Sequence, residues 1–89
     1  MSNRVTINKE VTVPELYFRT QDQTRGDLKS YPRRMEFEGR EYTFMDGLRF
    51  LIQKGHDLIQ VFDMTDGARD YRLKFDTMAK SWTLVDMSR

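Results

Sequence analysis

The sequence predicts a small α+β domain in which one short helix packs against an antiparallel sheet. Between Leu58 and Met87, apolar residues alternate with polar ones and turn residues fall at hairpin spacing, which is typical of a three-stranded meander. A second alternating stretch covers residues 35–44, and a helix-like spacing of apolar residues lies between the two stretches. Residues 35–89 are therefore expected to form a compact ββαβββ core within a single domain.

The first hairpin of the meander is expected to turn through a three-residue loop at residues 65–67. A glycine ends this loop, where a left-handed backbone conformation is needed. The loop places Val61 opposite Tyr71 and Ile59 opposite Leu73. Ile59 and Val61 should then face the core, because side chains on one face of a strand recur at every second residue.

The second hairpin of the meander is expected to turn at residues 77–80. This connection places Phe75 opposite Trp82 and Leu73 opposite Leu84. Both pairs unite apolar side chains, so Trp82 is expected in the core.

The upstream hairpin is expected to turn through a two-residue loop at residues 39–40. That loop pairs Phe37 with Tyr42 and Met35 with Phe44. The opposite face of the same hairpin is rich in glutamate and should face solvent.

Between the two sheet segments, residues 46–54 are expected to form the helix. Asp46 can cap its first turn, and Gly55 can end it in the left-handed conformation. The residues that share one side of this helix, where it would pack on the sheet, are Leu48, Leu51 and Ile52.

The first third of the chain is less regular. Residues 1–18 alternate well enough to form an edge strand or an extended arm, and Pro14 argues against a central strand because it lacks a backbone N–H. Residues 19–34 contain few apolar side chains and no periodicity, which predicts a long, exposed, basic loop.

Composition excludes several classes of function. The chain has no cysteine and one histidine, so disulfides, thiolate chemistry and an ordinary zinc site are excluded, and no cofactor is expected. A net charge of +1 is too small to attract a polyanion by itself. No stretch approaches the roughly 18 apolar residues of a membrane-spanning helix, and no leader-like segment begins the chain, which predicts a cytoplasmic protein.

A catalytic role is not expected. His56 is the side chain whose ordinary pKa lies nearest neutrality, and Asp57 follows it, but adjacent residues in a turn usually point apart. No nucleophile elbow, phosphate-binding loop or dinucleotide fingerprint is present in the sequence.

The surplus of apolar residues on the second face of the meander suggests a binding surface. If Ile59 and Val61 face the core, the opposite face carries apolar residues where a solvated sheet should be polar. Either the N-terminal segment covers this face, or the face binds a protein partner or a second copy of the chain. The partner-binding candidates are Leu58, Phe62, Met64, Val85 and Met87.

The alternative function is an accessory role in binding nucleic acid through the basic loop. Cations there outnumber acids, and a tyrosine is available to stack on bases. The candidate residues are Arg19, Arg25, Lys29, Tyr31, Arg33 and Arg34. Between the two, the sequence favours a small non-enzymatic protein-interaction module that acts through an apolar sheet face or a strand edge.

Overall fold

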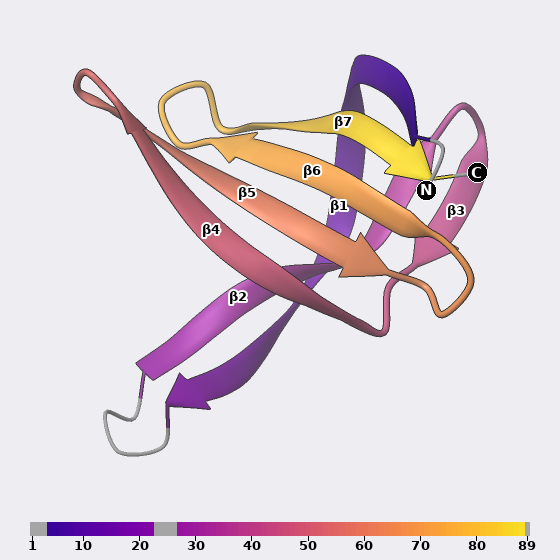
Figure 1. Ribbon diagram of the computed structural model, residues 1–89, viewed down its shortest axis with the longest axis horizontal. Helices are drawn as coiled ribbons and strands as arrows, with labels where there is room; N and C mark the ends of the chain where they lie inside the picture. Colours follow the sequence, from indigo (N-terminus) through magenta and orange to yellow (C-terminus); the bar gives the residue numbers. More distant parts are fainter. Residues whose placement is uncertain (1–3, 23–26, 89) are drawn as a thin grey trace.

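The computed structural model describes residues 4–22 and 27–88, and this part of the chain is all β. The α+β prediction is wrong, because the described residues contain no helix. Seven strands form one antiparallel sheet in the order β3-β2-β1-β7-β6-β5-β4 (Figure 1). The strands are β1 (Arg4–Asp22), β2 (Asp27–Phe37), β3 (Arg40–Thr43), β4 (Asp46–Lys54), β5 (Asp57–Thr65), β6 (Asp70–Asp76) and β7 (Ser81–Ser88).

The sheet folds into two layers, one formed by β2 and β3 and the other by β4 to β7. Two segments connect these layers. The first half of β1 pairs with β7 and its second half pairs with β2, so β1 is shared between the layers and is not an edge strand. Pro14 lies where the β1–β2 register is interrupted, a place where its missing N–H costs no ladder bond. At the junction of β3 and β4, the Phe44 amide donates to the Arg33 carbonyl (2.8 Å) and the Met45 amide to the Thr65 carbonyl (2.9 Å).

The segment predicted as a helix is strand β4. It pairs with β5 along its whole length, from Asp46 opposite Thr65 to Lys54 opposite Asp57. Its apolar residues at positions 48, 50, 51 and 52 fit a period of two as well as a helical period, so periodicity alone does not decide between them. Gly55, which was expected to end a helix, supplies the positive φ of +64° that the β4–β5 turn needs.

The register between β5 and β6 differs from the predicted one. Phe62 lies opposite Leu73 and Met64 opposite Tyr71, because the loop spans four residues, 66–69, and not three. The shift is an odd number of positions, so it exchanges the two faces of β5. Phe62 and Met64 point into the core, each 1% exposed.

Hydrogen bonds within the loop explain its length. The Asp66 carboxylate accepts from the Ala68 amide (2.9 Å) and the Arg69 amide (2.8 Å), as an Asx turn requires. Its other oxygen accepts from the Tyr71 hydroxyl (2.7 Å). Gly67 adopts a φ of +95°, which is costly for other residues. These bonds hold four residues in the loop and anchor the first buried side chain of β6.

Aromatic contacts join the two layers of the core. Tyr31 of β2 packs edge-on against Phe62 with ring centroids 5.8 Å apart, and Phe44 lies 5.2 Å from Tyr71. Figure 1 shows β2 crossing behind β5, and the Tyr31–Phe62 contact joins these two strands. The buried apolar residues are Val11, Tyr31, Met35, Phe44, Phe62, Met64, Tyr71, Leu73 and Leu84.

The other hairpins follow the sequence more closely. The predicted β6–β7 register is confirmed, with Phe75 opposite Trp82 and Leu73 opposite Leu84. In the β2–β3 hairpin the turn lies at Glu38 and Gly39, with φ of 52° and 75°, one residue earlier than predicted. This moves the register by two positions and leaves every side chain on its expected face.

Much of the predicted basic loop lies in strands. β1 continues to Asp22 and β2 begins at Asp27, so in the described part of this segment the backbone forms a hairpin ladder. Residues 23–26 lie outside the described residues. Tyr31, near the end of the segment, is fully buried.

The register can be tested by truncating neighbouring side chains of β5. Phe62→Ala should lower the free energy of unfolding by about 3 to 5 kcal/mol, because it empties a core position. Ile59→Ala should cost less than about 1 kcal/mol, because Ile59 lies on the outer face. Urea denaturation at low protein concentration measures both, and a larger loss for Ile59→Ala would contradict the observed register.

The loop can be tested through Asp66. Burial alone would raise the pKa of Asp66, but hydrogen bonds from Arg69, Ala68 and Tyr71 outweigh it and lower that pKa. Ionised Asp66 therefore stabilises the fold above its unfolded pKa of about 3.9, and this contribution is lost as pH falls through the lower folded value.

Asp66→Ala should cost about 1 to 3 kcal/mol, and Tyr71→Phe, which removes one bond and keeps the ring, about 0.5 to 1.5 kcal/mol. Urea titrations between pH 7 and pH 2.5 measure both effects. Asp66→Asn should flatten the acid dependence, and an unchanged pH profile in that variant would rule out this role.

Candidate functional site

The outer face of the β4–β5 hairpin carries a row of apolar side chains that no described strand covers. Since Phe62 and Met64 point inward, the alternate residues of β5 point outward, and the pairing brings the β4 residues at positions 48, 50 and 52 beside them. Leu48 is 62% exposed, Phe50 46% and Ile52 50%. We call this surface the β4 patch: Leu48, Phe50, Ile52, Ile59 and Val61.

The apolar character of the outer face ends at β6. Across from the outward residues of β5, strand β6 places Arg72, Lys74 and Asp76. Arg72 makes a two-pronged ion pair with Asp63, at 2.7 and 3.0 Å. The outer face is therefore charged at its centre and apolar at its β4 margin.

Strand β4 is also an edge of the sheet. In the described part of the chain it pairs with β5 alone, so one side of its nine-residue backbone is left without a strand partner. The other edge, β3, has four residues and carries a charged pair, Arg40 and Glu41. Short, charged edges resist pairing with other chains, whereas long apolar edges favour it. Strand β4 is the longer of these two edges, and its apolar residues at positions 48, 50 and 52 lie between Asp46 and Lys54.

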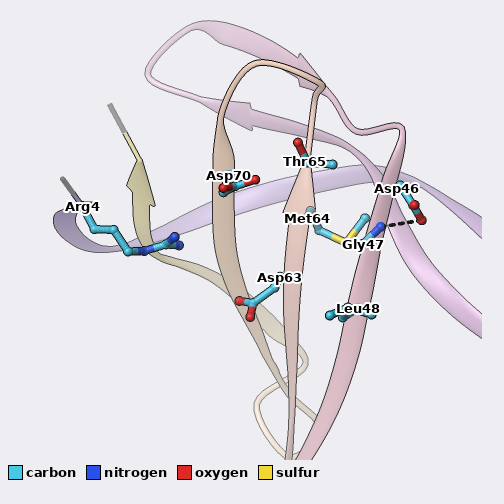
Figure 2. Close-up of a pocket in the computed structure, with 8 residues that line it drawn as sticks. All are labelled: Arg4, Asp46, Gly47, Leu48, Asp63, Met64, Thr65 and Asp70. Atoms are coloured by element: carbon cyan, nitrogen blue, oxygen red, sulfur yellow. Dashed lines mark hydrogen bonds between the residues drawn. The ribbon is translucent and has the colours of Figure 1, made fainter. Parts of the chain in front are cut away.

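A pocket of about 350 Å³ lies on the outer surface where β4 begins. Figure 2 shows it between the start of β4 and the side chain of Arg4, which reaches in from β1. Its lining consists of Arg4, Asp46, Gly47, Leu48, Asp63, Met64, Thr65 and Asp70. Leu48 belongs to both the pocket and the β4 patch, so the two features form one continuous surface.

The charged groups of the pocket take part in the fold itself. Arg4 donates from Nε to Asp86 (2.7 Å), and Asp63 pairs with Arg72. One oxygen of Asp46 accepts from the Gly47 amide at 2.8 Å. Among the described residues, no group of three or more His, Cys, Asp or Glu side chains is arranged to hold a metal ion. The pocket is thus a depression in the outer surface that borders the β4 patch.

Gly47 lets β4 approach β5 closely at the pocket floor. A Cβ at this position would lie 2.7 Å from the Asp63 carbonyl oxygen and would also collide with the Met64 sulfur. Figure 2 shows the Met64 side chain turned toward Gly47. The absence of a side chain here therefore permits both the close strand approach and the burial of Met64.

The chain matches no protein-family model, no curated protein and no solved structure. Within residues 4–22 and 27–88, no helix has the length and apolar character needed to cross a membrane.

The partner-binding residues predicted from the sequence do not form one accessible surface. Phe62 and Met64 lie in the core, where Tyr31 of β2 packs against Phe62. Val85 and Met87 are half-buried in β7, and Leu58 is exposed near the tip of the β4–β5 hairpin. The second face of the meander is thus the core face, covered by other strands of the same chain.

Of the predicted nucleic-acid residues, the structure describes the side chains of Tyr31, Arg33 and Arg34. Tyr31 is buried, and Arg34 lies 3.0 Å from Glu15 and 3.2 Å from Glu41, which neutralise it. Arg33 lies 3.9 Å from the same Glu15. Arg25 and the side chains of Arg19 and Lys29 lie outside the described part of the structure.

His56 lies at the exposed tip of the β4–β5 hairpin, beside Gly55. Its neighbour Asp57 begins β5 and pairs in register with Lys54. The pocket near the start of β4 is at the opposite end of the hairpin, so His56 is not part of it.

The β4 patch was not predicted from the sequence, because residues 46–54 were expected to form a helix and Ile59 and Val61 were expected to face the core. One signal could have found it. Residues 48, 50 and 52 are apolar at a strand spacing, and a hairpin through Gly55 places Phe50 opposite Val61 and Ile52 opposite Ile59.

The close approach at Gly47 predicts a steric cost. Gly47→Ala should destabilise the fold by about 1 to 3 kcal/mol, because the new methyl group meets a backbone carbonyl that cannot move freely. Leu48→Ala, at an exposed neighbouring position, should cost less than about 0.5 kcal/mol. Thermal or urea unfolding compares them, and equal stabilities would contradict the close packing.

Proposed function

We propose that this chain is a protein-interaction module and that it binds its partner through the β4 patch together with the free edge of β4. The observation that carries the proposal is that strand β4 combines a free sheet edge with three exposed apolar side chains on its outer face. Contiguous exposed apolar patches on small domains usually mark interfaces.

Pairing of an extended strand with β4 is the binding mode that this geometry supports. The unpaired N–H and C=O groups of a sheet edge can bond to an incoming strand, and such backbone bonds supply affinity. The row of Leu48, Phe50 and Ile52 supplies specificity, because it accepts apolar side chains at every second position of the incoming strand. The charged residues of β6 then border the contact and limit its extent.

The nucleic-acid alternative draws less support from the same structure. Its tyrosine is in the core, and its best-described cation, Arg34, already lies between two carboxylates. Phosphate binding through Arg34 would have to compete with both acids. A catalytic role is not proposed, since His56 is remote from the pocket.

A photo-activated cross-linker tests the proposal directly. Benzoylphenylalanine placed at Phe50 should trap a bound protein in cells of the native host, because position 50 is central in the β4 patch. The matched control carries the same group at Thr43, an exposed position on the other edge strand, β3. We expect discrete cross-linked products from position 50 and not from position 43.

Mass spectrometry then identifies each product as a second copy of this chain or as another protein. Either identity supports an interaction at β4. Equal products from both positions, or none from position 50, would refute the proposed function.

A further inference from the structure

Resting on the proposed function, we infer that the partner of β4 is β4 of a second copy, paired antiparallel about a two-fold axis at Phe50. The evidence is a self-complementary order of residues along the strand. Each copy contributes the same free edge, as a two-fold dimer interface requires.

The outward residues of β4 are complementary to the same residues in reversed order, because apolar residues then meet apolar residues and an acid meets a base. In order they are Asp46, Leu48, Phe50, Ile52 and Lys54. Antiparallel pairing centred on residue 50 places Asp46 opposite Lys54 of the second copy and Leu48 opposite Ile52 of the second copy. Phe50 then meets Phe50 of the second copy at the axis, where aromatic pairs are favourable cross-strand neighbours.

Neighbouring registers lose this complementarity. A two-fold axis perpendicular to the sheet keeps the outer faces together, so each register must be centred on a residue of the strand. Centring on Arg49 places that guanidinium opposite itself, and like charges directly opposite are destabilising. Centring on Leu51 places Lys54 opposite Leu48 and leaves Asp46 beyond the paired segment. Only the register at Phe50 matches apolar with apolar and acid with base.

The inward residues of β4 tolerate the same register. Arg49 lies opposite Leu51 of the second copy, and its Nε already donates to Gln60 of its own chain at 3.3 Å. Gly47 lies opposite Gln53 of the second copy, so no inward charge meets a like charge. The paired strands would join two sheets into one and place the two β4 patches side by side.

Single cysteines provide a test of the register, because the natural chain contains none. In the inferred dimer Phe50→Cys faces its own copy, whereas two cysteines at position 48 lie four residues apart along the strands, or about 13 Å. With oxidised glutathione as oxidant, Phe50→Cys should form disulfide-linked dimers at least tenfold faster than Leu48→Cys. Mixing Leu48→Cys with Ile52→Cys should yield the mixed dimer at a rate like that of Phe50→Cys.

Charge exchange gives a second, independent readout. Asp46→Lys and Lys54→Asp should each raise the dimer Kd at least tenfold in sedimentation equilibrium, because each places like charges opposite one another. Mixed together, the two variants should form a heterodimer with a Kd near that of the natural homodimer. Phe50→Lys, which leaves Asp46 and its turn intact, should abolish dimerisation while circular dichroism shows an unchanged fold.

The outcomes separate this inference from the proposed function. A chain that stays monomeric in sedimentation at millimolar concentration, with all cysteine variants oxidising at their urea-denatured rates, would overturn the dimer. Cross-links from position 50 to another protein would in that case leave the proposed function standing. A dimer in which Leu48→Cys links faster than Phe50→Cys would overturn the register.

Discussion

The carboxylate of Asp66 holds the loop on which the arrangement of the sheet depends. By accepting from two loop amides and from the Tyr71 hydroxyl, it keeps four residues between β5 and β6 and positions the first buried side chain of β6. A loop one residue shorter would exchange the faces of β5. Phe62 would then leave its contact with Tyr31, and the two layers would lose an aromatic contact that joins them.

The same register produces the candidate interaction surface. With Phe62 and Met64 inside, Ile59 and Val61 must face outward, and pairing with β4 adds three more apolar residues to that face. The β4–β5 hairpin carries apolar residues on both faces. In a chain this small one face packs into the core, and the other stays exposed to solvent. The register between β5 and β6 therefore determines both the core and the β4 patch. Because β4 is an edge strand, no further strand of the described chain lies beside the patch.

Local signals in the sequence predicted part of this fold. The β6–β7 register was predicted correctly from the pairing of Phe75 with Trp82. The two faces of the β2–β3 hairpin were also predicted correctly, although its register was wrong by two residues. The helix prediction was wrong because the apolar residues within 48–52 fit both a helical period and a strand period. Pairing with β5 makes this segment a strand. The strand spacing of residues 48, 50 and 52 indicates the β4 half of the patch, but the face of β5 that joins it depends on a loop whose length is set by the hydrogen bonds of Asp66.

Phe62 and Met64 face the core because β5 and β6 pair across a four-residue loop. Nuclear Overhauser contacts between backbone protons of the two strands measure that pairing directly. Pairing across the four-residue loop predicts cross-strand contacts that connect Phe62 with Leu73 and Met64 with Tyr71. Contacts that instead connect Val61 with Tyr71 and Ile59 with Leu73 would contradict this pairing. They would place Ile59 and Val61 in the core and turn Phe62 and Met64 outward.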